Sequence, residues 1–438
     1  MEQTSIDIVK KLKSHGYETY WAGGTVRDLL MGKSPKDYDI VTSAKPYQIE
    51  ELLEKTIPIG KKFGVIMAIK NGHSFEIATF RSDAAYTDGR RPSAVYFTNP
   101  REDALRRDFT INGMFYDPIE KKVLDFIGGQ EDLNKRILRF IGNPEDRIKE
   151  DNLRILRAIR FKNALNLKYA SETFKALKKD ACLIKNVSAE RISDELNKIL
   201  MLPGRENAFK ELDEAGILNC IMPEILELKG VMQPEKYHEE GDVFKHTLLS
   251  LEALPDKVSE ELAWATLFHD IGKPETYSID DRIRFNQHAQ VGAVIADNIM
   301  KRLKFSKYKR DNVKWLVEHH MVIGDIPKMK RTRQAHWVHN PLFPELLELL
   351  KADELGSKPK DLSLYHELKK LEEQKIELLP LPEKLITGEE IIKNFSLKAG
   401  PEIGNLLQKV HQAQMEEKIK TKKDALDFIR KIVSERKK

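Results

Sequence analysis

A glycine turn and a pair of aspartates lie close together in residues 21–42, and they limit what this chain can fold into. The segment reads WAGGTVRDLLMGKSPKDYDIVT. Gly23-Gly24 permits a tight turn, and the apolar run at Ile40-Val41 favours a strand. Two carboxylates at positions i and i+2 of a strand point to the same face. We therefore expect a mixed α/β region in which Asp37 and Asp39 project together.

Such a pair suits divalent cations. Magnesium prefers hard oxygen ligands and leaves room for phosphates, and two ions can serve one phosphoryl transfer. Gly24 lets the backbone approach a phosphate chain, and Arg27 adds a positive charge in the following helical turn. The alternative is a solvated Asp-Tyr-Asp turn after an ordinary Gly-Gly loop.

Composition sets broad bounds on the protein class. The chain has 438 residues, enough for two to four domains, and 33% of them are charged with a net charge of +5. That mildly basic balance permits a nucleic-acid partner without demanding one. The two cysteines, Cys182 and Cys220, predict neither a disulfide framework nor a thiolate zinc site, which fits a reducing, cytoplasmic setting. We find no apolar signal core and no run long enough to span a membrane.

The pattern along the chain predicts an α+β protein. Up to about residue 145 the sequence is mixed, with a hairpin expected at Asn71-Gly72. From about residue 146 the apolar spacing becomes helical, with a break at Pro203-Gly204. A histidine-rich helical region and a basic helical tail follow.

Three sequence blocks carry a family resemblance. GGTVRDLLMGKSPKDYDI, ALRRDFTING and EDNLRILRAIRF resemble the signature blocks of class II tRNA nucleotidyltransferases, the CCA-adding enzymes of the DNA polymerase β superfamily, and occur in the family's order. Bacterial poly(A) polymerases share these blocks. The resemblance implies a nucleotidyltransferase head at 1–145, a helical neck and body at 146–228, an HD domain at 229–360 and a helical tail at 361–438.

The resemblance also implies site residues. Asp37 and Asp39 match the family's metal ligands, and Gly24 and Arg27 match its triphosphate contacts. Four residues of the second block match its nucleotide site: Arg106, Arg107, Asp108 and Asn112. Gly113 stands where many members have alanine. Glu76 is a candidate third carboxylate or, equally, a surface strand residue.

The third block predicts a helix with two faces. On a helix over 151–161, the polar side carries Asp151, Arg154, Arg157 and Arg160. The apolar side would anchor that helix. A carboxylate can accept from the amino group of cytosine or adenine while a guanidinium donates to the ring nitrogen. Uracil and guanine present the opposite polarity, and the family assigns this role to the positions of Asp151 and Arg154. The alternative is a solvated face with an Asp–Arg pair.

Residues 81–104 are rich in turn formers and predict a surface loop. The segment resembles the family's flexible loop, which is needed for the final adenosine. Its presence argues against an enzyme that adds only cytidines, but it does not separate full CCA addition from addition of A alone.

Six of the 12 histidines lie between residues 238 and 320. Their order resembles the HD-domain metal phosphohydrolases. The resemblance implies the metal ligands His246, His269, Asp270, His288, His319, His320 and Asp353, with one of His319 or His320 serving a second ion. Such ligands suit a transition metal, Ni²⁺ or Mn²⁺, that activates water. The alternative is that single histidines cap helices or fill the core.

These motifs predict an enzyme that adds or repairs the CCA end of tRNA from CTP and ATP, with Mg²⁺ in the head and a second phosphohydrolase activity in the HD domain. One alternative is an A-adding enzyme or poly(A) polymerase. Another is an RNA-binding HD phosphohydrolase with a non-catalytic head. The intact pair of Asp37 and Asp39 argues against this second alternative. The basic and aromatic segments 302–315 and 327–337 suit RNA contacts or solvated helix faces equally. The oligomeric state is not predicted.

Overall fold

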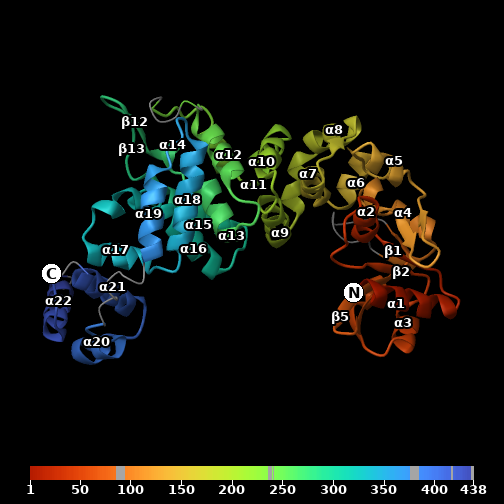
Figure 1. The fold of residues 1–438 in the computed structure, drawn as a ribbon, viewed down its shortest axis with the longest axis horizontal. Helices are drawn as coiled ribbons and strands as arrows, with labels where there is room; N and C mark the ends of the chain where they lie inside the picture. Colours follow the sequence, from red (N-terminus) through yellow and green to blue (C-terminus); the bar gives the residue numbers. More distant parts are fainter. Residues whose placement is uncertain (85–93, 235–238, 240, 375–383, 416–417, 436–438) are drawn as a thin grey trace. The chain divides into compact units, whose positions relative to one another are not determined.

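Figure 1 shows the computed structural model, which describes residues 1–84, 94–234, 239, 241–374, 384–415 and 418–435. The chain divides into two compact units. Unit 1 comprises Met1–Glu227, Pro255–Glu260 and Ile299–Ser306, and unit 2 comprises Leu228–Leu254, Glu261–Asn298 and Lys307–Lys438. Within the described residues, no helix is both long and apolar enough to cross a membrane.

A seven-stranded sheet organises the N-terminal part of unit 1, in the order β3-β4-β5-β2-β1-β8-β9. The strands are β1 (Thr19–Ala22), β2 (Ile40–Thr42), β3 (Thr56–Gly60), β4 (Val65–Lys70), β5 (His73–Thr79), β8 (Phe115–Asp117) and β9 (Lys122–Leu124). β2 and β5 pair in parallel, with Ile40 opposite Ile77, and the other neighbours pair antiparallel. The sheet thus places the start of β2 beside the middle of β5.

The hairpin predicted at Asn71-Gly72 is present between β4 and β5. Both turn residues have positive φ, 52° and 75°, which the sequence Asn-Gly tolerates and most residues do not. A second tight turn at Gly23, with φ of 64°, joins β1 to the next helix.

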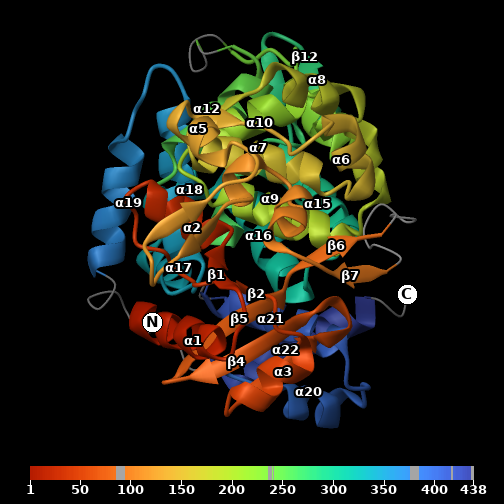
Figure 2. The same ribbon diagram turned by 90° about the vertical axis from the view of Figure 1, so that its right-hand side faces the viewer.

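Short helices complete this part of unit 1. They are α1 (Glu2–Ser14), α2 (Gly24–Leu30), α3 (Pro46–Leu52), α4 (Pro100–Leu105) and α5 (Gly129–Asn134), with the 3₁₀ turns η1 (Lys61–Phe63) and η2 (Thr110–Asn112). α1 and α3 pack against the sheet and against each other (Figure 2). Ile8, Val9 and Leu12 recur at helical spacing on α1 and are fully buried, which explains why this helix covers the sheet.

The segment expected to be a surface loop contains regular structure. β6 (Arg81–Asp83) pairs antiparallel with β7 (Val95–Phe97), and α4 follows. The tip of the expected loop, residues 85–93, lies outside the described residues. Asn99 accepts a hydrogen bond from the Glu102 N–H and Pro100 opens the helix, so a standard cap starts α4 within a stretch whose turn formers suggested no helix.

The rest of unit 1 is mainly helical, as predicted. Its elements are α6 (Pro144–Glu150), α7 (Arg154–Ala164), α8 (Ser171–Lys179), α9 (Ala189–Leu200), α10 (Arg205–Glu214) and α11 (Ile217–Ile221), with η3 (Ala181–Asn186), η4 (Pro223–Leu228) and the parallel pair β10 (Ile137–Leu138) and β11 (Lys168–Tyr169). The predicted break at Pro203-Gly204 separates α9 from α10. The apolar face of α7, from Ile155 to Ile159, is buried.

The expectation that the two cysteines form no disulfide framework needs correction. Cys182 on η3 and Cys220 on α11 form a disulfide, with their Cα atoms 5.5 Å apart. The two elements pack against each other, which brings together residues 38 positions apart in the sequence. Nothing in the local sequence around either cysteine indicates this packing.

Among its described residues, unit 2 is helical apart from one small hairpin, and two of its helices, α13 and α15, have one end assigned to unit 1. Its elements are α12 (Val243–Ala253), α13 (Glu260–Phe268), α14 (Lys273–Thr276), α15 (His288–Arg302), α16 (Lys307–His319), η5 (Val322–Lys328), α17 (Arg331–Val338), α18 (Phe343–Gly356), α19 (Ser363–Glu373), α20 (Gly388–Phe395), α21 (Pro401–Met415) and α22 (Lys422–Glu435). The hairpin pairs β12 (Tyr277–Ile279) with β13 (Ile283–Phe285). α13 is buried from Leu262 to Phe268, so it is the central helix of the histidine-rich region. Helices α20 to α22 share a separate apolar cluster.

Candidate functional site

A cleft of about 640 Å³ in unit 1 gathers most of the residues predicted for nucleotide transfer. The site residues predicted from the sequence that line this cleft are Gly24, Arg27, Asp39, Glu76, Arg106, Arg107, Asp108, Asn112, Asp151, Arg154 and Arg157. Seven arginines and five carboxylates face this space. The excess of guanidinium groups suits a polyanionic ligand such as a nucleoside triphosphate.

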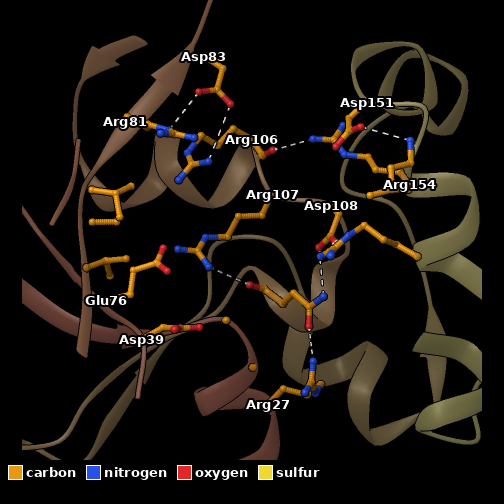
Figure 3. A pocket seen from close by; sticks show the side chains of 18 of the residues that line it. Arg27, Asp39, Glu76, Arg81, Asp83, Arg106, Arg107, Asp108, Asp151 and Arg154 are labelled. Atoms are coloured by element: carbon orange, nitrogen blue, oxygen red, sulfur yellow. Dashed lines mark hydrogen bonds and ion pairs between the residues drawn. The ribbon is translucent and has the colours of Figure 1, made fainter. Parts of the chain in front are cut away.

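One wall of the cleft is acidic. Asp39 and Glu76 lie close together on the sheet side (Figure 3). Burial raises the pKa of Asp39, and Asp37 adds to the rise while Arg107 opposes it. Burial also raises the pKa of Glu76, and the charge of Asp39 adds to it. Because the charge of Asp39 disfavours ionisation of Glu76, this wall fits a divalent cation, which would relieve the repulsion.

The predicted placement of the aspartates on a strand needs correction. β2 begins at Ile40, so both aspartates precede it. Thr25 fixes this approach, because its hydroxyl donates to the Asp37 carbonyl at 3.1 Å and accepts from the Asp39 N–H at 3.0 Å. Tyr38 is buried between Asp37 and Asp39, which keeps their alternation, but Asp37 does not line the cleft.

The backbone comes close to the acidic wall at the glycine turn. A Cβ added to Gly23 would lie 3.4 Å from a terminal nitrogen of Arg107 and 3.6 Å from a carboxylate oxygen of Asp39. Together with its positive φ, this leaves the turn to glycine. Arg27 reaches back from α2 and donates to the side-chain oxygen of Asn112 at 2.8 Å.

A buried aspartate orients the two adjacent arginines. Asp103 on α4 accepts from Arg106 at 2.8 Å and from Arg107 at 3.1 and 3.0 Å. Burial raises the pKa of Asp103, but the two guanidinium groups outweigh it and the pKa lies below its usual value. One buried carboxylate thus sets the direction of both arginines.

Asp108 links the head to helix α7. Its carboxylate accepts from Arg157 at 3.0 and 2.6 Å, from the Asn112 amide at 3.1 Å and from the Phe109 N–H at 2.8 Å. Burial raises the pKa of Asp108, but Arg157 and these donors outweigh it and lower the pKa to about 2. The predicted second and third blocks therefore meet through an ion pair.

Asp151 and Arg154 face the cleft opposite the acidic wall (Figure 3), but they do not pair with each other. Arg154 donates to Glu150 at 2.7 Å and to the Arg147 carbonyl at 2.8 Å. The single helix expected over 151–161 was wrong. α6 ends at Glu150, Asp151 has an extended backbone, and α7 begins at Arg154. Asp151 therefore lies in a break between helices rather than on a helix face.

Other residues depart from the expected set. Arg160 does not line the cleft and instead donates to Glu195 at 2.6 Å. Arg81, Asp83 and Arg191 line the cleft and were missed. The first two come from the segment interpreted as a loop. Arg191 lies 40 residues from Asp151 in sequence, and the helical pattern around it gave no sign of its direction.

Unit 2 contains a second candidate site. Two groups of three side chains could each hold a metal ion, because the ligand atoms within a group lie within 4.8 Å of one another. One group is formed by His246, His269 and Asp353, and the other by Asp270, His288 and His320. Within the described ranges, Asp37, Asp39 and Glu76 do not form such a group. His269 and Asp270 both follow α13 directly, but they fall in different groups, so that they share one metal stays a prediction.

Three of the histidines are oriented by a hydrogen bond at Nδ1, the ring nitrogen that faces away from the cluster. The Nδ1 of His269 lies 2.8 Å from the Thr266 carbonyl, that of His288 lies 2.9 Å from the Phe285 carbonyl, and that of His320 lies 2.7 Å from the Val317 carbonyl. Each Nδ1–H donates there, which leaves Nε2 with a free lone pair facing the cluster. Burial lowers the pKa of His288 and lowers that of His320 to about 3, so both rings are neutral and suited to a metal.

Asp270 faces both groups. One carboxylate oxygen lies 3.3 Å from His269 Nε2 and 3.7 Å from His246 Nε2, and the other lies 3.5 Å from His288 Nε2. Burial raises the pKa of Asp270, but Lys273 and His269 outweigh it, and the pKa lies well below its usual value. A carboxylate with this geometry can bridge two ions.

His319 does not belong to this cluster. Its Nδ1 bonds to the Trp315 carbonyl at 2.8 Å, and its ring stacks on that of Trp315. His320, one residue on, is the histidine that faces Asp270. His238, which was counted among the six clustered histidines, lies outside the described residues.

Family models match the chain in three successive regions. They are described as the poly A polymerase head domain over residues 19–139, the probable RNA and SrmB-binding site of polymerase A over 166–228, and the HD domain over 243–355. The CCA-adding enzyme of Staphylococcus aureus (strain MRSA252) is 30% identical over 416 residues, which cover 93% of this chain and 92% of that protein. The chain belongs to the CCA-adding enzyme family.

Other CCA-adding enzymes match over shorter stretches. The enzyme of Bacillus pumilus is 36% identical over 276 residues, or 63% of this chain. In three such relatives the chain spans 54% to 65% of their own length. The crystal structure of the Bacillus stearothermophilus CCA-adding enzyme in complex with CTP matches at a TM-score of 0.66 with 26% identity, covering 99% of this chain and 98% of that one.

Proposed function

We propose that this protein adds or repairs the 3′-terminal CCA of tRNA, using CTP and ATP without a nucleic-acid template. The observation that supports this most is the cleft of unit 1. It combines an acidic wall, a set of arginines and the pair Asp151 and Arg154 within one cavity of about 640 Å³. Relatives solved with CTP, with ATP and with tRNA_CCA agree with these partners.

Asp37 and Asp39 are proposed to hold Mg²⁺, with Glu76 as a third carboxylate. Bound there, the ions would supply Lewis-acid stabilisation of the phosphate charge. Arg27 and Arg107 bind the triphosphate. The 3′ hydroxyl of tRNA attacks the α-phosphorus, a new O–P bond forms, and the bond to pyrophosphate breaks.

Base choice is assigned to Asp151 and Arg154. The carboxylate accepts from the exocyclic amino group shared by cytosine and adenine, and the guanidinium donates to a ring nitrogen. Uracil and guanine would place a carbonyl oxygen against the carboxylate. A cleft that leaves such groups unpaired rejects them. The side of the cleft that carries Asp151 and Arg154 is shaped and oriented by the other predicted lining residues, which are Arg106, Asp108, Asn112 and Arg157.

The product can be tested with tRNA that lacks its CCA. CTP alone should add cytidines, ATP alone should add nothing, and the two together should restore the complete end. Addition of A only to tRNA that already ends in CC would identify an A-adding enzyme. A long tail made from ATP alone would identify a poly(A) polymerase. We place this activity in the cytoplasm, where it would meet tRNA and nucleoside triphosphates.

A second activity is proposed for the histidine cluster of unit 2. Asp270 belongs to one of the two ligand groups, and its other carboxylate oxygen lies 3.3 Å from His269 Nε2 of the second group. Three imidazoles are held with Nε2 facing the cluster. This set fits a transition metal, Ni²⁺ or Mn²⁺, which would provide an activated water. Hydrolysis of a terminal or 2′,3′-cyclic phosphate would regenerate the free 3′ hydroxyl that nucleotide addition requires.

This activity can be measured on RNA with a cyclic-phosphate end and on a generic phosphomonoester, with nickel, manganese or magnesium supplied in turn. Turnover should depend on the ion. No turnover with any ion, together with no bound metal by elemental analysis, would leave the cluster a structural feature.

A further inference from the structure

Asp151 is held by an arginine from another helix. Nη2 of Arg191, on α9, lies 3.1 Å and 3.0 Å from the two carboxylate oxygens of Asp151. The pair is largely shielded, with 23% of the Arg191 side chain and 20% of the Asp151 side chain exposed. Both residues line the cleft. Arg191 is therefore the group that sets the direction of this carboxylate.

Asp151 needs such a support because its own backbone does not provide one. It lies in the break between α6 and α7 with φ of −141° and ψ of 103°. The Leu153 N–H donates to its carboxylate at 3.2 Å, and its backbone carbonyl accepts from the Arg154 N–H at 3.0 Å. An aspartate in an extended break can turn its carboxylate more freely than one within a helix.

Helix α9 is held in place by its packing against α7 and by an ion pair between the two helices, so the backbone position of Arg191 is fixed. Leu196 and Ile199 are fully buried, and α9 packs against α7. On the same helix Glu195 accepts from Arg160 of α7 at 2.6 Å. Arg160, which was expected to face the cleft, thus locks α9 to α7, and Arg191 projects from the locked helix toward Asp151.

One nitrogen of Arg191 meets Asp151, and Nη1 is buried with no hydrogen-bond partner among the described residues. We propose that Arg191 is the positioning residue for base selection, holding the Asp151 carboxylate in the direction that accepts an amino group and repels a carbonyl. This inference rests on the proposed function. A carboxylate free to rotate could turn away from the carbonyl of uracil or guanine, and rejection would weaken.

The test compares nucleotide discrimination in Arg191→Ala and wild type. The ratio of kcat/KM for CTP to that for UTP should fall by about tenfold or more, because a mobile carboxylate no longer rejects the carbonyl. The KM for CTP should rise more than kcat falls, since the reacting phosphates are bound elsewhere in the cleft. Arg191→Lys, which keeps the charge but loses the planar fork, should recover part of the ratio.

A double-variant cycle identifies the route. If Arg191 acts through Asp151, then adding Arg191→Ala to Asp151→Ala should change the CTP to UTP ratio no further. The matched control is Lys198→Ala on the same helix, whose side chain is 56% exposed and reaches Glu195 instead of Asp151. That variant should keep the wild-type ratio.

Two outcomes separate this inference from the proposed function. Wild-type protein that adds neither CTP nor ATP to tRNA refutes the function itself. Wild-type protein that adds both, with Arg191→Ala losing thermal stability or overall rate at an unchanged CTP to UTP ratio, overturns only the positioning role.

Discussion

Asp39, directly before β2, and Glu76, on β5, lie close together, and burial makes each carboxylate costly to ionise. Such a wall gains most from a cation, whose charge offsets both. The two predicted aspartates differ in position, because Asp39 lines the cleft whereas Asp37 lies on the exposed approach to β2 and does not line it. Asp39 is therefore the position at which a neutral substitute should be most harmful.

Asp39→Asn should abolish nucleotide addition and leave tRNA binding nearly unchanged. The variant keeps the size of the side chain but removes the charge that a divalent cation needs, and a loss of several kcal/mol corresponds to a rate drop of at least about a thousandfold. Single-turnover extension and a tRNA binding assay measure the two properties. Glu120→Gln, an exposed head carboxylate, is the control and should be active. Extension by Asp39→Asn at near the wild-type rate would contradict the assignment.

The Asp108–Arg157 pair should make stability depend on pH. The pKa of Asp108 is lowered to about 2 in the folded protein. In the unfolded chain an aspartate has a pKa of about 4, so the pair's contribution is present above that value and is lost as pH falls toward about 2. The shift corresponds to roughly 2 kcal/mol.

Asp108→Asn should therefore unfold at lower urea concentration near neutral pH, and its difference from wild type should narrow as pH falls below about 4. Glu102→Gln, an exposed carboxylate on α4, should differ little from wild type at either pH. A difference between Asp108→Asn and wild type that stays constant across this range would show that the ion pair does not cause it.

At the scale of elements, the disulfide between η3 and α11 closes a loop of 38 residues in the region matched by the RNA-binding family model. Such a link restricts the unfolded chain more than the folded one. Because η3 leads directly into α9, the disulfide anchors the segment from which Arg191 projects.

Reduction of the disulfide should lower the free energy of unfolding of unit 1 by up to about 4 kcal/mol, from the entropy of a loop of this size. Thermal or urea unfolding with and without dithiothreitol measures the change. The double variant Cys182→Ser with Cys220→Ser is the control, since the reductant should not affect it. Rapid alkylation of both cysteines in the folded, untreated protein would show that the bond does not form.

Local chemistry predicted some of these elements well. The Asn71-Gly72 turn carries its own conformational signal, and the apolar spacing at Ile155 and Ile159 predicts a buried face. The break at Asp151 carries only a weak signal, the turn formers Asp151 and Asn152, which the helical apolar spacing of the segment outweighs. Pairings across the sequence, such as Asp151 with Arg191 or Cys182 with Cys220, depend on how helices pack and could not be predicted from the residues near them.

The choice between neighbouring histidines was also beyond the sequence. His319 and His320 differ in direction by one helical step, about 100°, and either could face the cluster until the packing of α16 is known. Trp315 stacks on His319 and settles the choice. The bridging of two ligand groups by Asp270 likewise needs coordinates, whereas membership of His246 and Asp353 followed from the motif order.

For the whole molecule, the two candidate sites use residues of different compact units. The cleft lies in unit 1 and the histidine cluster in unit 2. Each site carries its own charged groups and its own ligands. Two activities in one chain should therefore respond separately to substitution.

His269→Ala should lose metal-dependent phosphate hydrolysis and keep nucleotide addition, and Asp39→Asn should do the reverse. Removal of one imidazole leaves the group of His246 and Asp353 short of a ligand. Hydrolysis, nucleotide addition and bound metal are measured on each variant. The adjacent pair gives a matched control, because His320→Ala should lose hydrolysis and His319→Ala should keep it. Equal loss of hydrolysis in His320→Ala and His319→Ala would contradict the ligand assignment.

The parallel pairing of β2 with β5 decides where this chain tolerates changes of length. Ile40 lies opposite Ile77, so Asp39 and Glu76 stand one step before a matched pair and share a face. One residue inserted between Phe75 and Ile77 would turn Glu76 to the other side of the sheet. Residues added at the exposed Asn71-Gly72 tip would leave that match intact. Peptide tags and reporters inserted at the hairpin tip should therefore leave the acidic wall intact. The same insertions a few residues later, within β5, should disrupt it.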